Sequence, residues 1–392
     1  MPTRPCRVEI STRALEDNFR FLKSLAAPHA ELLAIVKADA YGHSLALCAP
    51  AAVRAGAESL GVTSVEEGIS AREICPRSRI LVIGGVFPGQ GFAVVEHRLT
   101  TVVWDAWQID ELESAAQSAL APSGSIPVHI EIDTGMSRQG AVSPDGLAPL
   151  LARFTTAGPL RLGGIMTHLY AADEADGRVT AEQLIRLDAA LDEVAAAGLH
   201  PQWLNVGNSA ALLDGRAEAI GAQARARGMK ALLRPGLALY GLVPRFDPAE
   251  PDAFAAARSG LLPVLAWKSA VVSVVSVPAG TVVGYNGTFV ATEPMRLALI
   301  AAGYGDGLTR SLGNRFSLLI RGQRAPIAGR ISMDQTVLDV TDIPDVQPGD
   351  EVAIIGSQGE ESITAHDHAD AAHTIPWEIF TRIAPRVTRI AV

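Results

Sequence analysis

The chain has 392 residues, of which 48% are hydrophobic and 19% are charged, and its net charge is −9. This composition predicts a large packed core and argues against intrinsic disorder. No run of Lys or Arg stands out, which argues against a nucleic-acid surface but leaves room for a local basic pocket that binds a small anion.

The three cysteines, Cys6, Cys48 and Cys75, have neither CxxC nor metal-ligand spacing. A low, odd count without such spacing suits a reducing compartment. The start of the chain has no apolar segment of signal-peptide length, and no later segment has the roughly 20 apolar residues of a membrane-spanning helix. We therefore expect a cytoplasmic protein with no membrane partner.

Apolar, strand-like runs alternate with Ala-rich helical stretches through the first two-thirds of the chain. The runs occupy 32–36, 59–63, 79–84, 100–104, 127–132, 162–168, 202–206 and 229–234. A typical intervening stretch, 178–198, has a threonine as a cap signal, an apolar stripe and Gly198 as a stop. Eight such units over about 230 residues predict an α/β fold, a (β/α)8 TIM-like barrel. An open doubly wound sheet is the alternative, because alternation alone does not show closure.

The character of the sequence changes near residue 245. The stretch "GLVPRFDPAEPD" (241–252) is rich in Pro and acidic residues, as a linker would be. Beyond it, β-branched runs occupy 270–277, 281–291, 296–303, 316–322, 336–340 and 351–356, and only 364–382 looks helical. We therefore predict a barrel domain over 10–245 and a mainly antiparallel β domain over 246–392, with residues 1–9 open to joining the second.

Polar residues fall at the C-terminal ends of the predicted barrel strands, where barrels build their sites. These residues are Lys37, Arg138, His168, Asn208, Ser209 and Arg234. Ser209 and the N–H groups of Gly236 and Leu237 follow the seventh and eighth strands, the usual place of a barrel's phosphate site. A phosphate there, together with a lysine after the first strand, suggests pyridoxal phosphate. Lys37 would hold the cofactor aldehyde as a Schiff base, and an arginine could face the ring nitrogen.

Eight motifs carry a family resemblance: "AIVKADAYGH", "DTGMSRQG", "THLYAADE", "NVGNSAALL", "RPGLALYG", "GYGDG", "GRISMDQ" and "TIPWEI". In this order, from about residue 7 to the C-terminus, they resemble the successive motifs of bacterial alanine racemases. The resemblance implies a barrel followed by a β domain, in a head-to-tail homodimer whose active sites combine both chains. It implies racemisation of alanine with pyridoxal 5'-phosphate and with no metal.

The resemblance also implies roles for single residues. Lys37 would carry the cofactor and Arg234 would contact the pyridine nitrogen, while Tyr285 would be a second base from the partner chain. The remaining cofactor contacts would be Tyr41, His168, Asn208, Ser209, Gly236 and Leu237. The substrate residues would be Arg138, Met333 (through its backbone), Tyr304 and Asp334. Arg310 and Asp173 match entry-channel positions.

Racemisation removes the α-proton on one face and returns one on the other, so one base on each face suffices. Lysine and tyrosine side chains have pKa values of about 10 in water, too high for bases at neutral pH. Desolvation and nearby cations would lower the pKa of Lys37. A tyrosine base needs nearby positive charge, because burial alone raises its pKa. We expect His168 and Arg234 to supply that charge.

The sequence departs from the family pattern at three positions. Ser44 stands where Gly is common, and Pro385 stands where many members place a tyrosine that touches the phosphate. Glu131 stands where many members have a lysine that is carbamylated and holds the substrate-binding arginine. We predict that Glu131 replaces the carbamate and pairs with Arg138, directly or through a water. The alternative is that Glu131 only satisfies nearby backbone or tyrosine donors.

Two other functions are alternatives to racemisation. A barrel-type basic amino-acid decarboxylase shares the architecture but uses a cysteine of its β domain, and this chain has no cysteine after Cys75. A non-enzymatic, cofactor-carrying barrel would not need a β domain with Tyr285. Serine as the preferred substrate stays open, as does the choice between D-alanine for cell-wall synthesis and D-alanine breakdown. The histidine-rich stretch 366–373 is read as a capped helix and not as a metal site.

Overall fold

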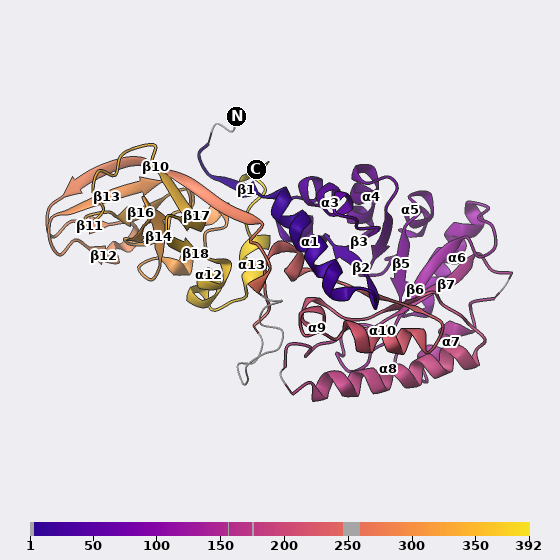
Figure 1. Ribbon diagram of the computed structural model, residues 1–392. Coiled ribbons are helices and arrows are strands. Elements are labelled where there is room, and N and C mark those ends of the chain that lie inside the picture. The colour runs from indigo at the N-terminus through magenta and orange to yellow at the C-terminus, as the bar shows by residue number, and fades with distance from the viewer. Residues whose placement is uncertain (1–3, 156, 175, 246–258) are drawn as a thin grey trace. The chain divides into compact units, whose positions relative to one another are not determined.

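The computed structural model describes residues 4–155, 157–174, 176–245 and 259–392. The described chain divides into two compact units, whose helices and strands are labelled in Figure 1. The barrel unit is made of 13–40 and 48–262, apart from the gaps, and the sheet unit is made of 4–12, 41–47 and 263–392. The predicted linker 241–252 lies for the most part outside the described residues, so the domain boundary at 245/246 stays a prediction.

The barrel unit is built on a closed ring of parallel strands. They are β2 (Ala30–Ile35), β3 (Ser59–Val62), β4 (Arg79–Val82), β5 (Thr100–Val103), β6 (Ile126–Glu131), β7 (Leu160–Met166), β8 (Trp203–Asn205) and β9 (Lys230–Leu233). Closure comes from the pairing of β2 with β9, in which Leu32 lies opposite Leu233. The predicted barrel is therefore confirmed, and the open sheet is excluded.

Helices follow most of the barrel strands. They are α3 (Leu45–Arg54), α4 (Val65–Ile74), α5 (Gly91–Glu96), α6 (Ala106–Ser118), α7 (Leu147–Leu151), α8 (Arg178–Ala196), α9 (Ser209–Leu213) and α10 (Ala217–Arg225), whereas α1 (Thr12–Ala26) precedes the first barrel strand, β2. Helix α8 buries Leu187, Ala190, Leu191 and Val194, the spacing of one helical face. It begins after Gly177, so the threonine expected as its cap, Thr180, lies inside the first turn and donates its hydroxyl to the Ala171 carbonyl.

Within the described residues, the sheet unit contains a nine-stranded, mainly antiparallel sheet. Its strands are β1 (Arg7–Ile10), β10 (Leu265–Val277), β13 (Met295–Ile300), β14 (Ser317–Ile320), β15 (Gln323–Pro326), β16 (Thr336–Asp339), β17 (Glu351–Gln358), β18 (Glu361–Ile363) and β19 (Thr388–Ala391). Strand β1 pairs antiparallel with β10 and parallel with β19, so residues 7–10 do join this sheet. The helices α12 (Ala365–Ala372) and α13 (Pro376–Thr381) occupy the stretch predicted to be helical.

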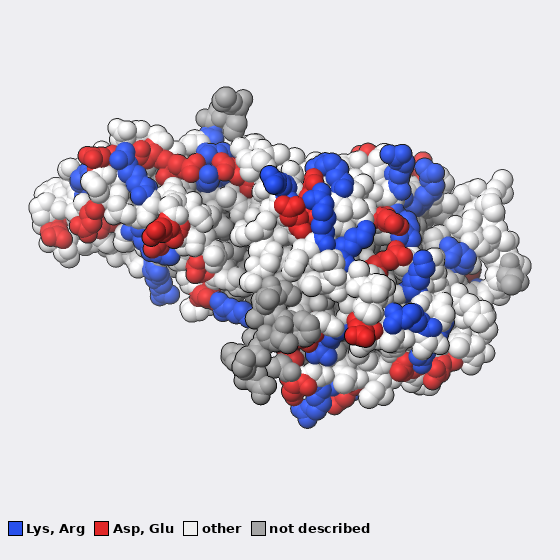
Figure 2. Space-filling model, in the orientation of Figure 1, with Lys and Arg blue, Asp and Glu red and all other residues white. Residues whose placement is uncertain are grey.

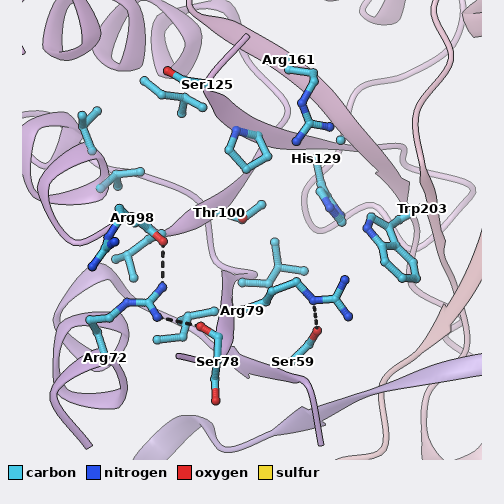
Figure 3. A pocket seen from close by; sticks show the side chains of 18 of the residues that line it. Ser59, Arg72, Ser78, Arg79, Arg98, Thr100, Ser125, His129, Arg161 and Trp203 are labelled. Atoms are coloured by element: carbon cyan, nitrogen blue, oxygen red, sulfur yellow. Dashed lines mark hydrogen bonds between the residues drawn. The ribbon is translucent and has the colours of Figure 1, made fainter. Parts of the chain in front are cut away.

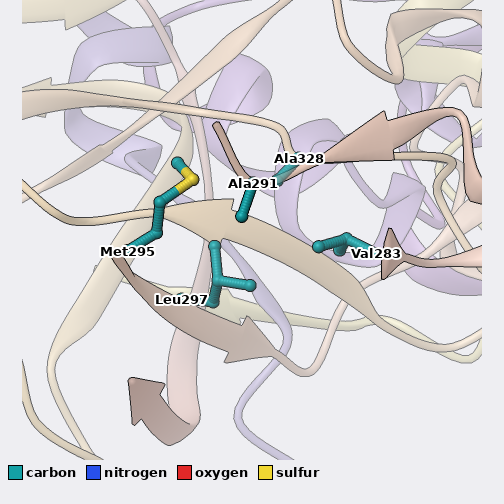
Figure 4. Close-up of a cluster of buried hydrophobic side chains, with 5 residues drawn as sticks. All are labelled: Val283, Ala291, Met295, Leu297 and Ala328. Atoms are coloured by element: carbon teal, nitrogen blue, oxygen red, sulfur yellow. The ribbon is translucent and has the colours of Figure 1, made fainter. Parts of the chain in front are cut away.

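The run 281–291 is not the single strand that its β-branched residues predicted. It forms a hairpin of β11 (Val282–Val283) and β12 (Phe289–Val290) around the 3-10 turn η2 (Tyr285–Gly287). Gly284 and Asn286 have φ of 71° and 61°, a region that glycine and asparagine tolerate and that breaks a strand. A buried apolar cluster of Val283, Ala291, Met295, Leu297 and Ala328 includes residues from both sides of this turn and fixes its base (Figure 4).

The histidine-rich stretch forms helix α12, capped by a reciprocal pair of Thr364 and Asp367. His368 is buried and donates through Nε2 to the Ile354 carbonyl at 2.8 Å. Across the described ranges no group of three His, Cys, Asp or Glu side chains could hold a metal ion. No helix in the same ranges is long and apolar enough to cross a bilayer. Figure 2 shows positive and negative side chains interspersed over the visible face.

A buried carboxylate ties three parts of the sheet unit together. Asp306, in the 3-10 turn η3 (Tyr304–Asp306), is fully buried. Both of its oxygens accept from Arg4, while Arg386 Nε donates at 2.8 Å and the Gly303 N–H at 2.9 Å. Arg386 also donates to the Asp334 carboxylate at 2.7 Å. The carboxylate therefore fixes the loops that contain Tyr304 and Asp334.

Replacing this carboxylate should destabilise the protein strongly. In Asp306→Ala the two guanidinium groups lose their shared partner, and we expect a loss of about 3 kcal/mol in the free energy of unfolding. The matched control is Glu361→Ala, which removes an exposed pair with Arg324 and should cost less than about 1 kcal/mol. Urea unfolding of both variants checks this. Equal midpoints for the two variants would contradict a structural role for Asp306.

Candidate active site

Lys37 follows strand β2 and begins a left-handed turn. In this segment, α2 (Lys37–Tyr41), φ is 51° at Ala38 and Asp39 and 56° at Ala40, a conformation that costs L-residues energy. The Glu67 carboxylate accepts the Ala38 N–H and the Thr63 N–H, each at 2.7 Å. Glu67 thus holds the chain just after Lys37, and the strain lies at the place where the sequence put a reactive amine.

Lys37 itself is half-buried, and its amine forms no hydrogen bond or ion pair with any residue that the structure describes. Burial lowers the pKa of Lys37, and the positive charges of Arg138 and Arg234 lower it further, while Glu67 opposes them. This is the direction expected for a lysine that acts as a nucleophile and base near neutral pH.

Arg234 follows strand β9, and its side chain is buried among the carboxyl ends of neighbouring barrel strands. Its Nη1 donates to the backbone carbonyl and the side-chain Oδ1 of Asn205 at 2.7 and 2.6 Å, and its Nη2 donates to the Thr167 carbonyl at 2.8 Å. Nη2 also contacts His168 Nδ1 at 3.2 Å. Burial lowers the pKa of Arg234 to about 10, so the guanidinium stays charged at neutral pH. Its Nε donates to no described residue.

His168 is neutral in this environment. Because an arginine N–H can only donate, Nδ1 of His168 must accept, and its ring proton then lies on Nε2. Burial lowers the pKa of His168 to about 3, and Arg234, Arg138 and Lys37 contribute to the shift. The expectation that His168 supplies positive charge is therefore wrong, because its cationic neighbours suppress its protonation. Arg234 is the fixed charge at this position.

Glu131, at the end of β6, is buried and has a neutral partner. Gln139 donates from Nε2 to Glu131 Oε2 at 2.5 Å and also to the Ile83 carbonyl at 3.2 Å. Burial raises the pKa of Glu131 to about 7, although Gln139, Arg234 and Arg138 lower it. The expected direct ion pair with Arg138 is absent among the described residues: Glu131 ends a barrel strand and is buried, whereas Arg138 lies in the exposed loop that follows. Glu131 and Arg138 interact through electrostatic attraction, which lowers the pKa of Glu131.

The residues predicted to bind an anion, Ser209, Gly236 and Leu237, lie together after strands β8 and β9. Ser209 Oγ accepts the N–H groups of Gly236 and Ala238 at 3.0 and 3.2 Å, and Leu237 begins the 3-10 helix η1 (Leu237–Tyr240). Asn208 caps helix α9: its Oδ1 accepts the Ala211 N–H at 3.1 Å. Asn208 therefore has a structural task at the edge of the site.

In the sheet unit, the three predicted site residues with large side chains are exposed. Tyr285 is 65% exposed, Met333 53% and Tyr304 41%. The loops of the last two are bonded to each other, because the Gly305 N–H donates to the Met333 carbonyl at 2.8 Å. A side chain at Gly303 would come within 2.5 Å of that carbonyl, so only glycine fits there. The Met333 N–H donates to no described residue and is free for a ligand.

Other predicted residues of the sheet unit have structural partners. The Asp334 carboxylate accepts from Arg386, and the Asp334 carbonyl accepts from Arg4 at 3.1 Å, so Asp334 fixes the loop of its neighbour Met333. Tyr41 has a φ of 53°, and burial raises its pKa to about 12. At Pro385 no tyrosine is present.

Three residues that support the site of the barrel unit were not predicted from the sequence. Glu67 could have been found, because Ser64-x-x-Glu67 has the spacing of a helix capping signal. Gln139 lies inside the motif "DTGMSRQG", but nothing in the motif shows that its amide faces Glu131. Asn205 ends strand β8, and only closure of the barrel brings it to Arg234.

Together, the strand ends of the barrel and the loops that follow them present two arginines, Arg138 and Arg234, the amine of Lys37 and one buried carboxyl group, Glu131. Such a balance attracts an anion, and the unpaired amine of Lys37 can form a covalent bond to a carbonyl compound.

Comparison with known proteins identifies the family of the chain. The family model for the alanine racemase N-terminal domain matches residues 10–244, and the model for the C-terminal domain matches 264–391. An alanine racemase from Nostoc sp. is 36% identical over 388 residues, which cover 98% of this chain and 95% of the relative.

Solved structures show the same similarity. Alanine racemase from Streptomyces lavendulae has a TM-score of 0.88 and 33% identity, with 100% of this chain and 98% of that chain covered. Alanine racemase from Bartonella henselae, solved with covalently bound pyridoxal phosphate, has a TM-score of 0.83 and 28% identity, with both chains covered completely. Matches to both domains, over the full length and in fold, show that this chain is an isomerase that belongs to the alanine racemase family.

Proposed function

We propose that the protein interconverts L- and D-alanine with pyridoxal 5'-phosphate, using Lys37 and Tyr285 as its two bases. The observation that carries this proposal is the state of Lys37. Its amine is half-buried, has no partner among the described residues, and has a pKa lowered by burial and by two arginines. A lysine kept this way serves no stabilising ion pair and is suited to chemistry.

The chain's residues fit the cofactor. Lys37 offers the amine for its aldehyde. For its phosphate, the Leu237 N–H donates to no described residue and can bind an oxygen, whereas the Gly236 N–H now donates to Ser209 Oγ and would have to turn to the phosphate. Nε of Arg234 is left without a partner and can face the ring nitrogen. When bound, pyridoxal phosphate would stabilise the negative charge that forms at the amino acid's α-carbon. A structural relative from Bartonella henselae holds this cofactor covalently.

Each residue has a defined task in this proposal. Lys37 takes or returns the α-proton on one face, and Tyr285 from the partner chain does so on the other. Arg138 and the free N–H of Met333 bind the substrate carboxylate. Arg234 keeps its own proton, since a guanidinium does not readily release it. The ring nitrogen then stays unprotonated, which disfavours transamination.

The protein would act as a cytoplasmic homodimer with shared sites. Tyr285 is 65% exposed on the sheet unit, as a base destined for another chain's barrel must be. The cysteines of the protein, Cys6, Cys48 and Cys75, are buried and form no disulfide, which suits a reducing compartment.

Borohydride reduction should attach the cofactor permanently to Lys37. We expect purified protein to be yellow, and a digest after reduction should contain one pyridoxyl-labelled peptide that includes residue 37. Lys37→Ala should abolish the label, whereas Lys23→Ala should leave it intact because Lys23 lies on helix α1 beside the Gly56 carbonyl. A label on another lysine would contradict the assignment.

Tyr285→Phe should slow racemisation about 10²–10⁴-fold, the usual contribution of a general base. Cofactor content, read from the absorbance spectrum, should stay unchanged because Tyr285 is not a cofactor residue. Chiral chromatography of alanine and serine reactions measures the rates and the substrate preference together. Turnover within a few-fold of the unmodified protein would remove Tyr285 from the mechanism.

Mixing Lys37→Ala protein with Tyr285→Phe protein should restore part of the activity. In a heterodimer, one of the two shared sites regains both bases, so exchange of subunits should rescue a fraction of turnover. Size-exclusion chromatography with differently tagged chains verifies the exchange. Exchange without any rescue argues against sites shared between chains.

Glu131→Gln should change the pH dependence of alanine binding. Because the pKa of Glu131 is about 7, its carboxylate becomes charged as the pH rises through neutrality and can then orient Arg138. We expect KM for alanine to fall across this range in the unmodified protein and to be higher and flatter in Glu131→Gln. Added bicarbonate should have no effect on either, since a glutamate cannot be carbamylated.

Glu131→Gln should also change how the free energy of unfolding depends on pH. The pKa of Glu131 is raised from its ordinary value of 4.5, so its contribution to stability is present below about pH 4.5 and is lost as the pH rises through about 7. Glu131→Gln lacks this loss and should gain stability relative to the unmodified protein over that window.

For the prediction on alanine binding, identical KM profiles of the unmodified protein and Glu131→Gln would exclude Glu131 from substrate binding.

A further inference from the structure

A second cavity lies at the other end of the barrel from Lys37. It has a volume of about 1040 Å³ and is lined by the first residues of strands β3, β4, β5 and β6, which are Ser59, Arg79, Thr100 and Ile126 (Figure 3). Parallel strands place their first residues at one end of a barrel and their last residues at the opposite end. A ligand in this cavity therefore cannot reach the residues proposed for catalysis.

The charge of the cavity is strongly one-sided. Five arginines line it, and no Asp or Glu is among its lining residues: Arg72, Arg77, Arg79, Arg98 and Arg161. The whole chain has a net charge of −9, so this concentration of positive charge runs against the average of the molecule. A concave surface lined by one sign of charge raises the local concentration of the opposite ion.

Two of the five arginines already have hydrogen-bond or ion-pair partners within the protein. Arg72 donates to backbone carbonyls, including those of Ser78 and Arg98, and Arg79 pairs with Glu31 and Glu58. The other three have exposed side chains with no hydrogen bond or ion pair to any residue in the described part of the chain: Arg77, Arg98 and Arg161. Three unpaired guanidinium groups at one cavity are free to hold an anion.

A buried histidine in the cavity wall lacks a partner. His129 is 4% exposed, and its Nδ1 has no hydrogen-bond partner. Figure 3 shows its ring between Arg161 and Trp203, at the wall of the cavity. Burial lowers the pKa of His129 to about 3, so the ring is neutral. A buried polar atom without a partner is costly, and a ligand with a polar group at this wall would relieve the cost.

The rest of the wall is apolar and partly aromatic. It includes Leu33, Ile80, Leu81, Leu99 and Leu232. Trp203 contributes an indole ring that the Arg79 guanidinium covers at 4.9 Å from the ring centre. An inorganic ion would leave this surface wet, whereas an organic body would bury it. The volume is also that of a pocket for a small organic molecule, roughly 300–1,000 Å³.

We propose that this cavity binds a phosphorylated organic anion of nucleotide size, with its phosphates at Arg77, Arg98 and Arg161 and its body against Trp203 and the leucines. Charge-assisted hydrogen bonds from arginine suit phosphate oxygens, and the apolar wall gives preference to a ligand with a planar or apolar body. The proposal concerns binding and is independent of the proposed racemase chemistry.

Isothermal titration calorimetry on the full-length protein, supplied with pyridoxal phosphate, tests the proposal with three probes. These are ADP, pyrophosphate as charge without a body, and adenosine as a body without charge. We expect ADP to bind more tightly than either of the others. The double variant Arg98→Ala/Arg161→Ala should weaken ADP roughly tenfold or more, and each single variant by less. Arg13→Ala, on the exposed face of helix α1, is the matched control and should bind ADP unchanged.

Other results would overturn the proposal. ADP heats that are absent at millimolar concentration, or equal in the double variant and the unmodified protein, would show that the cavity is no phosphate site. Pyrophosphate or adenosine binding as tightly as ADP would reduce the cavity to a simple anion or apolar site. Displacement of pyridoxal phosphate by ADP, seen in the absorbance spectrum, would place the binding at the opposite end of the barrel. Thermal melting shows whether each variant is folded.

Discussion

The structure of the barrel's site depends on one buried positive charge. Arg234 is 5% exposed. A guanidinium does not readily lose its proton, so Arg234 stays charged although burial of a charge costs free energy. The chain meets that cost with oxygens at the ends of neighbouring strands, from Asn205 and Thr167. Because these acceptors belong to strand ends, the charge is fixed in place before any ligand arrives.

The protonation states of the surrounding groups depend on the positive charge of Arg234. It helps to suppress the protonation of His168, contributes to the low pKa of Lys37 and lowers the pKa of Glu131 against the effect of burial. The site thus consists of a neutral histidine, a readily deprotonated lysine and a carboxylate that titrates near neutrality. This combination suits a reaction in which protons leave and return at neutral pH and the other charges stay fixed.

Much of this arrangement was predictable from the sequence, and the reasons are specific. Eight apolar runs with helical stretches between them predicted the barrel, and barrel geometry placed Lys37, His168 and Arg234 at one end. The hairpin at Tyr285 was not predicted, because β-branched residues on both sides concealed the turn formed by Gly284 and Asn286. The partners of buried polar groups were also missed, because the path of a loop decides whether Glu131 meets Gln139 or Arg138. The arginines of the second cavity are spread over 72–161, and only closure of the barrel brings them together.

In the proposed mechanism, two different bases act on opposite faces of the substrate. The most direct test is to convert L-alanine in heavy water and to follow the α-hydrogen of each enantiomer by proton NMR during the first turnovers. The account predicts that newly formed D-alanine carries deuterium while the remaining L-alanine still carries its original hydrogen. D-Alanine that retains the original α-hydrogen would show one base moving a single proton between faces, and would contradict the account.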